Sequence, residues 1–126
     1  MPAQAVEVYL NGVGARQVAE REWGLTLEAD GEGGWPLDVG IRIADGLVRI
    51  QAFALGAARA PDDADVLHWN RRTRMVRFAR TRSGDVWVHA DLPVELADET
   101  QLDRLMGLVV EAAYAARRRV VGDASR

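Results

Sequence analysis

The clearest pattern in the chain is the alternation of hydrophobic and polar residues from position 37 to position 55 (LDVGIRIADGLVRIQAFAL). A period of two residues is typical of strands that bury one face. Asp45-Gly46 interrupts the pattern, and this dipeptide is favoured in two-residue type I′ turns because both positions tolerate positive φ. We therefore predict a β-hairpin. The expected cross-strand pairs are Ile43 with Val48, Ile41 with Ile50, Val39 with Ala52 and Leu37 with Ala54.

The two faces of this hairpin differ in character. The predicted pairs gather their apolar side chains on one face, which we expect to pack on helices. The other face is expected to be wet or to meet a partner. It holds Asp38, Arg42, Arg49, Gln51 and Phe53.

A second hairpin is predicted from residues 76–81 and 86–92, joined across residues 82–85. Two registers compete. Pairing Arg82 with Val86 gathers the apolar residues on one face and sets Arg77 opposite Asp91, an opposite-charge pair. Pairing Arg82 with Asp85 instead places arginine on the apolar face. We expect the first register.

Residues 16–28 (RQVAEREWGLTLE) alternate only in part and predict a single strand. Residues 29–34 (ADGEGG) follow as a glycine-rich, acidic loop. Neither GxGxxG nor GxxxxGK[ST] spacing is present, and the loop contains Asp30 and Glu32. We therefore predict no phosphate-binding loop there.

Two short helices are expected in the first three quarters of the chain. Residues 2–11 form the first, with Ala5, Val8 and Tyr9 at helical spacing, and Gly12 and Gly14 end it. The second begins at a cap on Asp62 or Asp63 and runs through Arg72. Its expected buried side chains are Val66, Leu67 and Trp69.

The last helix has the strongest signals. Asp98-x-x-Gln101 is a capping box, and an apolar stripe recurs behind it at intervals of three and four. Arg117 to Arg119 are expected in the last turn, where the helix dipole favours cations, and Gly122 is expected to follow the helix. The stripe consists of Leu102, Leu105, Met106, Val109, Ala113 and Ala116.

These elements follow the order α-β-β-β-α-β-β-α, which predicts an α+β fold with an antiparallel sheet packed against helices. The 126 residues fit one domain over residues 1–121, with a frayed tail at 122–126. This length is close to the size at which dimerisation helps to complete a core.

Composition narrows the class of protein. A net charge of −3 gives a whole-molecule field that does not favour nucleic acid. The absence of cysteine excludes disulfides, a zinc ribbon and a thiol nucleophile. The first residues lack the features of a signal peptide, and no apolar run approaches membrane-spanning length, so we expect a cytoplasmic protein with no membrane partner. All 16 basic residues are arginine, which we attribute to codon bias in a GC-rich genome.

Candidate catalytic groups are few. His68 and His89 are the only histidines, and His89-x-Asp91 is a two-ligand pattern that does not make a zinc or iron site. Ser83 lies in a turn and Ser125 in the tail, so neither indicates an activated nucleophile. We predict a protein that is not an enzyme and that needs neither a metal nor a cofactor.

An arginine cluster supports a second hypothesis. Arginines interleave with Trp69, Phe78 and Trp87, as in basic sheets that stack single-stranded nucleic acid on aromatic rings. Strand alternation divides these arginines between two faces, and nearby acidic residues neutralise much of their charge, so nucleic-acid binding is the alternative function. The cluster consists of Arg71, Arg72, Arg74, Arg77, Arg80 and Arg82.

The passage LHWNRRTRMVRFARTRSGDVWVHADLPV resembles the helix–strand–strand segment of the YbjN family. An Asn-containing helix end precedes a strand with a central aromatic, then a Ser-Gly-Asp turn and a strand ending in Leu-Pro. The run DETQLDRLMGLVVEAAYAARRR resembles the closing helix of the family. The resemblance covers roughly residues 35–119 and implies the fold of class I type III secretion chaperones, which are small, acidic, usually homodimeric proteins that bind a segment of another protein. Some YbjN proteins are linked to stress responses.

We therefore expect a non-catalytic chaperone or adaptor that forms a homodimer and binds another cytoplasmic protein. Tryptophan and arginine dominate binding hot spots, so Trp23 and Trp35, which flank the acidic loop, are candidate anchors, although we expect at least one of them in the core. The polar face of the first hairpin adds further candidates. The predicted partner-binding residues are Trp23, Trp35, Arg42, Arg49 and Phe53.

The expected assembly is a homodimer, and the expected ligand is a segment of another protein of the cytoplasm. This expectation rests on the resemblance and on the absence of any catalytic pattern in the sequence.

Overall fold

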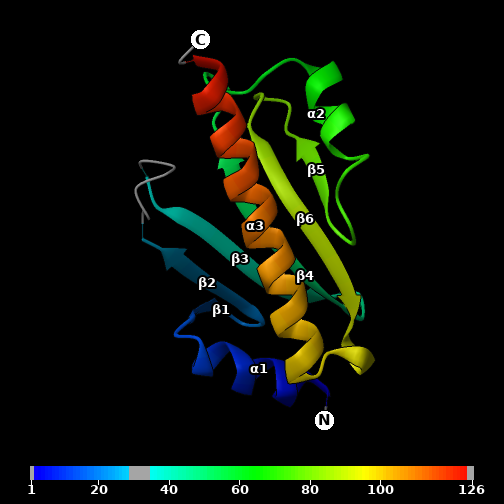
Figure 1. The fold of residues 1–126 in the computed structure, drawn as a ribbon. Helices are drawn as coiled ribbons and strands as arrows, with labels where there is room; N and C mark the ends of the chain where they lie inside the picture. Colours follow the sequence, from blue (N-terminus) through cyan, green and yellow to red (C-terminus); the bar gives the residue numbers. More distant parts are fainter. Residues whose placement is uncertain (1, 29–34, 125–126) are drawn as a thin grey trace.

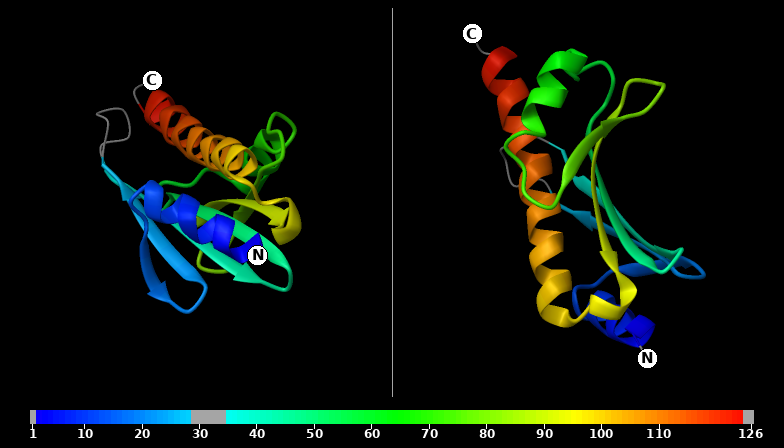
Figure 2. Two further views of the ribbon diagram at one scale, coloured as in Figure 1. Left: turned by 90° about the horizontal axis from the view of Figure 1, so that it is seen from below. Right: turned by 90° about the vertical axis from the view of Figure 1, so that its right-hand side faces the viewer.

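A computed structural model describes residues 2–28 and 35–124 of the chain, and the predicted glycine-rich loop at 29–34 lies outside the described residues. One six-stranded antiparallel sheet curves around a long C-terminal helix (Figures 1 and 2). The helices are α1 (Pro2–Gly12), α2 (Asp63–Trp69) and α3 (Glu99–Ala124), with a short 3-10 turn η1 (Val94–Leu96). The strands are β1 (Arg16–Ala19), β2 (Glu22–Leu27), β3 (Leu37–Ala44), β4 (Leu47–Leu55), β5 (Arg77–Arg80) and β6 (Val86–Pro93).

The strands lie in the order β1-β2-β3-β4-β6-β5. The β3–β4 hairpin has the predicted register, with Ile43 opposite Val48 and Ile41 opposite Ile50. Its turn adopts positive φ at both central positions, 55° at Asp45 and 74° at Gly46, as a type I′ turn requires. The hydrophobic pattern and the turn residues therefore determined this register together.

The prediction of one strand over residues 16–28 is wrong, because the segment forms the β1–β2 hairpin. Its tight turn places Arg21 at a φ of 58°, a conformation that glycine or asparagine usually occupies. All four residues of β1 are exposed, so β1 has no alternation to reveal it. The observed order thus has one more strand than the predicted one.

The β5–β6 hairpin differs from both registers that the sequence left open. Its loop closes at Thr81 and Asp85, with a hydrogen bond from the Thr81 amide to the Asp85 carbonyl oxygen, and Gly84 adopts a φ of 96°. The loop has the expected length but lies one residue earlier in the chain, which shifts the pairing by two residues, so Arg77 lies opposite His89 rather than Asp91. A shift of two residues keeps every side chain on its predicted face.

The two short helices bury different side chains from those expected. In α1 the buried residues are Val6, Tyr9 and Leu10, whereas Val8 is 71% exposed. Asp62 caps α2 by accepting a hydrogen bond from the Asp65 amide, but the helix ends at Trp69 instead of Arg72. Leu67 is 67% exposed, so its predicted burial is also wrong. Short helices offer too few turns for spacing alone to identify the packed face.

The prediction for α3 is confirmed over its first five turns. The Asp98 side chain accepts a hydrogen bond from the Gln101 amide, and every residue of the predicted stripe is buried. The helix continues past Gly122 to Ala124, so the predicted end at Gly122 is wrong. Because α3 lies along the concave side of the sheet, its stripe packs mainly over β4 and β6 (Figure 2).

Candidate functional site: the open face of the sheet

The described helices all lie to one side of the sheet or at its ends, and none of them crosses the opposite face (Figure 2). We call this opposite surface the open face. Strand alternation supplies its side chains, which are mostly exposed or half-buried. Its central residues are Glu22, Gly24, Asp38, Gly40, Arg42, Arg49, Gln51, Phe53, Trp87, His89 and Asp91.

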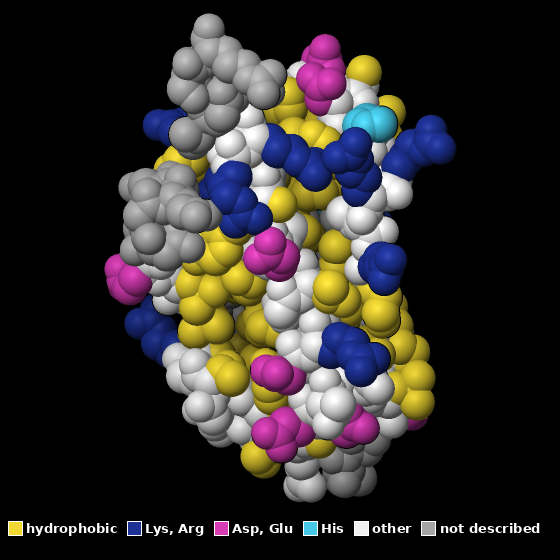
Figure 3. Space-filling model, in the orientation of Figure 1, with side chains coloured by type: hydrophobic (Ala, Val, Ile, Leu, Met, Phe, Trp, Pro, Cys, Tyr) yellow, Lys and Arg dark blue, Asp and Glu magenta, His cyan; other side chains and the backbone are white. Residues whose placement is uncertain are grey.

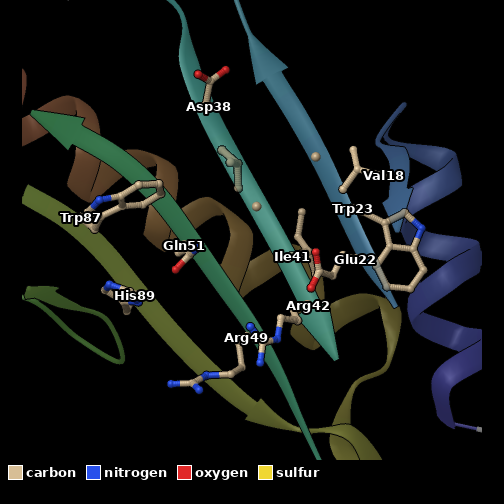
Figure 4. A pocket seen from close by; sticks show the side chains of 13 residues that line it. Val18, Glu22, Trp23, Asp38, Ile41, Arg42, Arg49, Gln51, Trp87 and His89 are labelled. Carbon is tan, nitrogen blue, oxygen red and sulfur yellow. The ribbon is translucent and has the colours of Figure 1, made fainter. Parts of the chain in front are cut away.

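Two glycines face each other at the middle of the open face. Gly24 of β2 is the cross-strand partner of Gly40 of β3, so two adjacent positions have no side chain. A hollow of about 480 Å³ lies over them (Figure 4). Val18 borders it on one side, and Gln51 and His89 border it on the other.

The fold itself does not require these glycines. Neither Gly24 nor Gly40 has a left-handed φ. A Cβ atom on Gly24 would lie 3.7 Å from Val18 Cγ1, and one on Gly40 would lie 3.7 Å from Gln51 Cγ, both ordinary contacts. Glycine in a strand interior costs stability, and it often marks a place where a ligand or another backbone approaches closely.

A row of charges borders the hollow on one side. Asp91 binds two arginines, accepting from Arg49 Nε at 3.0 Å and from Arg77 at 3.1 Å. Arg42 lies opposite Arg49 in the sheet, and it makes no ion pair within the described part of the chain. Arg42 has Glu22 as its partner on β2, but no ion pair within the described residues holds its guanidinium.

Trp87 borders the hollow on its other side, and Phe53 packs against Trp87 without lining the hollow. Phe53 and Trp87 are cross-strand partners whose rings meet edge to face, with centroids 5.2 Å apart. Both side chains are half-buried, so part of each ring remains accessible. The open face thus offers a backbone floor between aromatic and charged side chains, which suits an extended segment of another protein.

His89 completes the row of Gly24, Gly40 and Gln51. Burial lowers the pKa of His89 from its ordinary value of 6.5, and Arg77 lowers it further, while Asp91 acts in the opposite direction. The imidazole is consequently neutral at pH 7 and provides a hydrogen-bonding group without charge.

The structure brings together only some of the predicted partner-binding residues. Arg42, Arg49 and Phe53 all lie on the open face, as the hairpin pattern predicted. Trp23 is 5% exposed and its side chain points toward α1, so the idea of Trp23 as an exposed anchor is wrong and the expected core role is confirmed (Figure 4). Gly24 and Gly40 were not among the predicted site residues, because their pairing depends on a β2–β3 register that no turn residues indicate.

Trp35 lies away from the open face, where its ring contacts Arg117. The predicted position of Arg117 is wrong. Arg117 was expected in the last turn of α3, but it is 1% exposed. Its guanidinium donates to the carbonyl oxygens of Trp35 and Ala54, both at 2.9 Å, and of Phe53 at 3.2 Å. The arginine therefore joins α3 to the end of β4 and to the segment before β3, and it has a structural role.

The six arginines of the alternative nucleic-acid site do not form one surface. Arg77 binds Asp91 on the open face, whereas Arg80 binds Asp63 at 2.7 Å and the Pro61 carbonyl oxygen at 2.8 Å. Arg82 lies in the β5–β6 loop. The remaining three, Arg71, Arg72 and Arg74, lie in the connection between α2 and β5.

The two edges of the sheet differ in accessibility. The Asn70 side chain accepts from the Phe78 amide at 2.6 Å and donates to the Phe78 carbonyl oxygen at 3.1 Å, so it occupies the outer edge of β5. At the other edge, β1 is short, exposed and interrupted by an irregularity between Gln17 and Ala19. Strand addition is consequently obstructed at the centre of β5.

The described residues contain neither a metal-binding cluster nor a membrane-spanning helix. No group of three or more His, Cys, Asp or Glu side chains there is placed to hold a metal ion. Among the described helices, none combines the length and apolarity that crossing a membrane demands.

Solved structures show the class of protein to which this fold belongs. A chain of the Yersinia pestis type III secretion chaperone SycH in complex with a stable fragment of YscM2 has 15% identity and a TM-score of 0.67, covering 92% of this chain and 99% of that chain. A chain of the ExoU–SpcU heterodimer from the Pseudomonas aeruginosa type III secretion system has 13% identity and a TM-score of 0.64, covering 91% and 96%. The protein therefore has the fold of type III secretion chaperones, as predicted.

The family is more specific than the fold. The model of the YbjN family, described as "Putative bacterial sensory transduction regulator", matches residues 39–120, and the chain belongs to this family. The structure of Escherichia coli YbjN, called a putative transcription regulator, has 13% identity and a TM-score of 0.66, covering 96% of this chain and 92% of that chain. No curated protein matches the sequence. The resemblance to YbjN is thus confirmed.

Proposed function

We propose that this protein is a non-catalytic protein-binding module whose open face holds an extended segment of another protein. The observation that supports this most directly is the hollow over Gly24 and Gly40, since the fold does not require either glycine. A partner segment that packs closely against the exposed backbone would explain why both positions are glycine.

The chemistry around the hollow fits a peptide segment. Phe53 and Trp87 supply aromatic surface for an apolar side chain, and Arg42 supplies a cation without an ion pair in the described structure. Aromatic and arginine side chains contribute most strongly to binding energy at protein interfaces. The Y. pestis chaperone with the same fold is in complex with a fragment of another protein, which supports the same kind of role here.

Three further properties are the location of the protein, its oligomeric state and the process in which it acts. We propose that the protein works in the cytoplasm as a homodimeric chaperone or adaptor, in a stress response. The support is the resemblance to the YbjN family, together with small size and a net charge of −3. Light scattering of the purified protein tests the dimer, and a monomer at micromolar concentration would remove that part of the proposal.

The experiment that tests the function is capture of partners from native lysate with two matched variants. Gly40→Leu fills the hollow, and Gly107→Leu adds the same side chain at an exposed position of α3. We expect one protein partner to remain bound to the unmodified protein and to Gly107→Leu after nuclease treatment, and to be lost from Gly40→Leu. A partner that binds all three proteins equally would show that the open face is not the binding surface.

The alternative function is nucleic-acid binding through the arginine cluster. The distribution of these arginines over separate surfaces and the ion pairs of Arg77 and Arg80 weigh against it. The same capture experiment addresses it, since partners that disappear with nuclease and bind in a salt-sensitive way would favour nucleic acid.

A further inference from the structure

A second hollow lies on the helical side of the molecule, between α3 and the connection from α2 to β5. It has a volume of about 250 Å³ and is separate from the open face. Arginines gather across the upper part of this side, over apolar surface beside α3 (Figure 3). We call this hollow the arginine groove.

The floor of the arginine groove is apolar, and its aromatic rings pack against each other. Trp69 and Phe78 meet with ring centroids 5.3 Å apart, and both are buried. Leu108, Ala112 and Ala115 of α3 form the opposite wall. Small side chains at two of these three positions leave room for an apolar side chain from outside.

The rim of the groove is strongly cationic. Arg72, Arg74 and Arg119 line it, and none of the three has an ion-pair partner among the residues that the structure describes. The one acidic residue in the lining, Glu111, is bound by Arg118 at 2.9 Å. The groove therefore presents positive charge that the protein does not neutralise, although the whole chain is acidic.

We propose that the arginine groove binds an acidic segment of a partner protein that inserts an apolar side chain between α3 and the α2–β5 connection. Charge complementarity at the rim and apolar contact at the floor define this ligand. Such a segment would have Asp or Glu on both sides of a residue such as Leu or Phe. The proposal concerns a surface distinct from the open face and does not depend on the function proposed for that face.

Nucleic acid fits the groove less well than an acidic peptide. Single strands bind by stacking bases on exposed aromatic faces. In the groove, Trp69 and Phe78 are buried, and the Arg119 guanidinium lies over the Trp69 ring at 5.4 Å. The aromatic rings are therefore not available as stacking platforms.

The test measures fluorescence anisotropy with three labelled probes: a peptide with leucines flanked by glutamates, the same peptide with glutamine for glutamate, and a single-stranded oligonucleotide. The double variant Arg72→Glu/Arg74→Glu is compared with Arg16→Glu/Arg104→Glu, a matched reversal at exposed positions outside the groove. Circular dichroism verifies that each variant is folded.

We expect the acidic peptide to bind the unmodified protein and the control variant, and to lose roughly tenfold or more in affinity for the groove variant. The glutamine peptide should bind the unmodified protein no more tightly than the acidic peptide binds the groove variant. Equal binding of both peptides, equal loss in both double variants, or binding of the oligonucleotide alone would overturn the proposal. None of these outcomes bears on the hollow over Gly24 and Gly40.

Discussion

The Arg117 guanidinium carbon lies 4.4 Å from the centre of the Trp35 ring, and the same group donates a hydrogen bond of 2.9 Å to the Trp35 carbonyl oxygen. One side chain thus binds both the ring and the backbone of its neighbour. Because Arg117 also binds the end of β4, it fixes the segment before β3 against α3. This arrangement explains a buried cation in a protein whose other buried side chains are almost all apolar.

Replacing Arg117 with methionine is expected to destabilise the protein by about 3 kcal/mol or more, because several buried carbonyl groups lose their hydrogen bonds. Urea unfolding followed by circular dichroism measures the change. Arg118→Met is the control, since Arg118 is exposed and its ion pair with Glu111 is worth less than about 1 kcal/mol. Similar losses in the two variants would contradict the structural role of Arg117.

Substituting valine for Gly40 is expected to leave the free energy of unfolding unchanged or to raise it by up to about 1 kcal/mol. Valine favours strands, and its Cβ meets only ordinary contacts at this position. Gly84→Val serves as the contrast, since Gly84 has a φ of 96° and a Cβ there would lie 2.9 Å from the Ala57 Cβ. Thermal melts distinguish the two, and strong destabilisation by Gly40→Val would mean that the fold does need this glycine.

Changing Asn70 to aspartate should lower the free energy of unfolding by about 1–3 kcal/mol, because the carboxylate cannot donate to the Phe78 carbonyl oxygen and would repel it. Hydrogen exchange of the Phe78 amide, compared between the variant and the unmodified protein, locates the effect on β5. The same change at the exposed Asn11 should be nearly neutral. An unchanged exchange rate at Phe78 would rule out the proposed edge contact.

Tyr9 makes the free energy of unfolding depend on pH in the alkaline range. Burial and a hydrogen bond of 3.1 Å to Asp103 raise the pKa of Tyr9 to about 12, from 10.0. The unfolded chain loses its proton first as pH rises through 10, whereas the folded protein keeps it until about 12. The free energy of unfolding should therefore fall across this interval, by roughly 2–3 kcal/mol.

The Tyr9→Phe variant should lose this component of the pH dependence, while Tyr114→Phe should keep it. Urea unfolding at intervals between pH 9 and about 12 measures both. An identical decline in stability in the two variants would show that Tyr9 is not the group responsible.

Sequence reasoning succeeded where pattern and local chemistry agreed. The Asp45-Gly46 turn fixed the β3–β4 register, and the capping box at Asp98 fixed the start of α3. It failed where backbone conformation departed from residue preference, as at Arg21, whose positive φ hid the β1–β2 turn. Local patterns contain little information on such exceptions.

The candidate site was predictable on one strand pair only. Arg42, Arg49 and Phe53 follow from the alternation within one hairpin. The hollow arises from the pairing of Gly24 with Gly40 across a long connection, and the burial of Arg117 depends on contacts with residues 35 and 54. Both are products of tertiary arrangement, which no short stretch of sequence specifies.

The strand order has a consequence for the newly made chain. β4 emerges from the ribosome well before β6, the strand that pairs with its second edge. Until Val86 and its successors are synthesised, that edge presents unpaired backbone next to a strongly apolar face, a combination that promotes aggregation. A charge within a hydrophobic strand opposes such association, and Arg49 supplies one in the middle of β4. In the finished sheet the same charge is bound by Asp91.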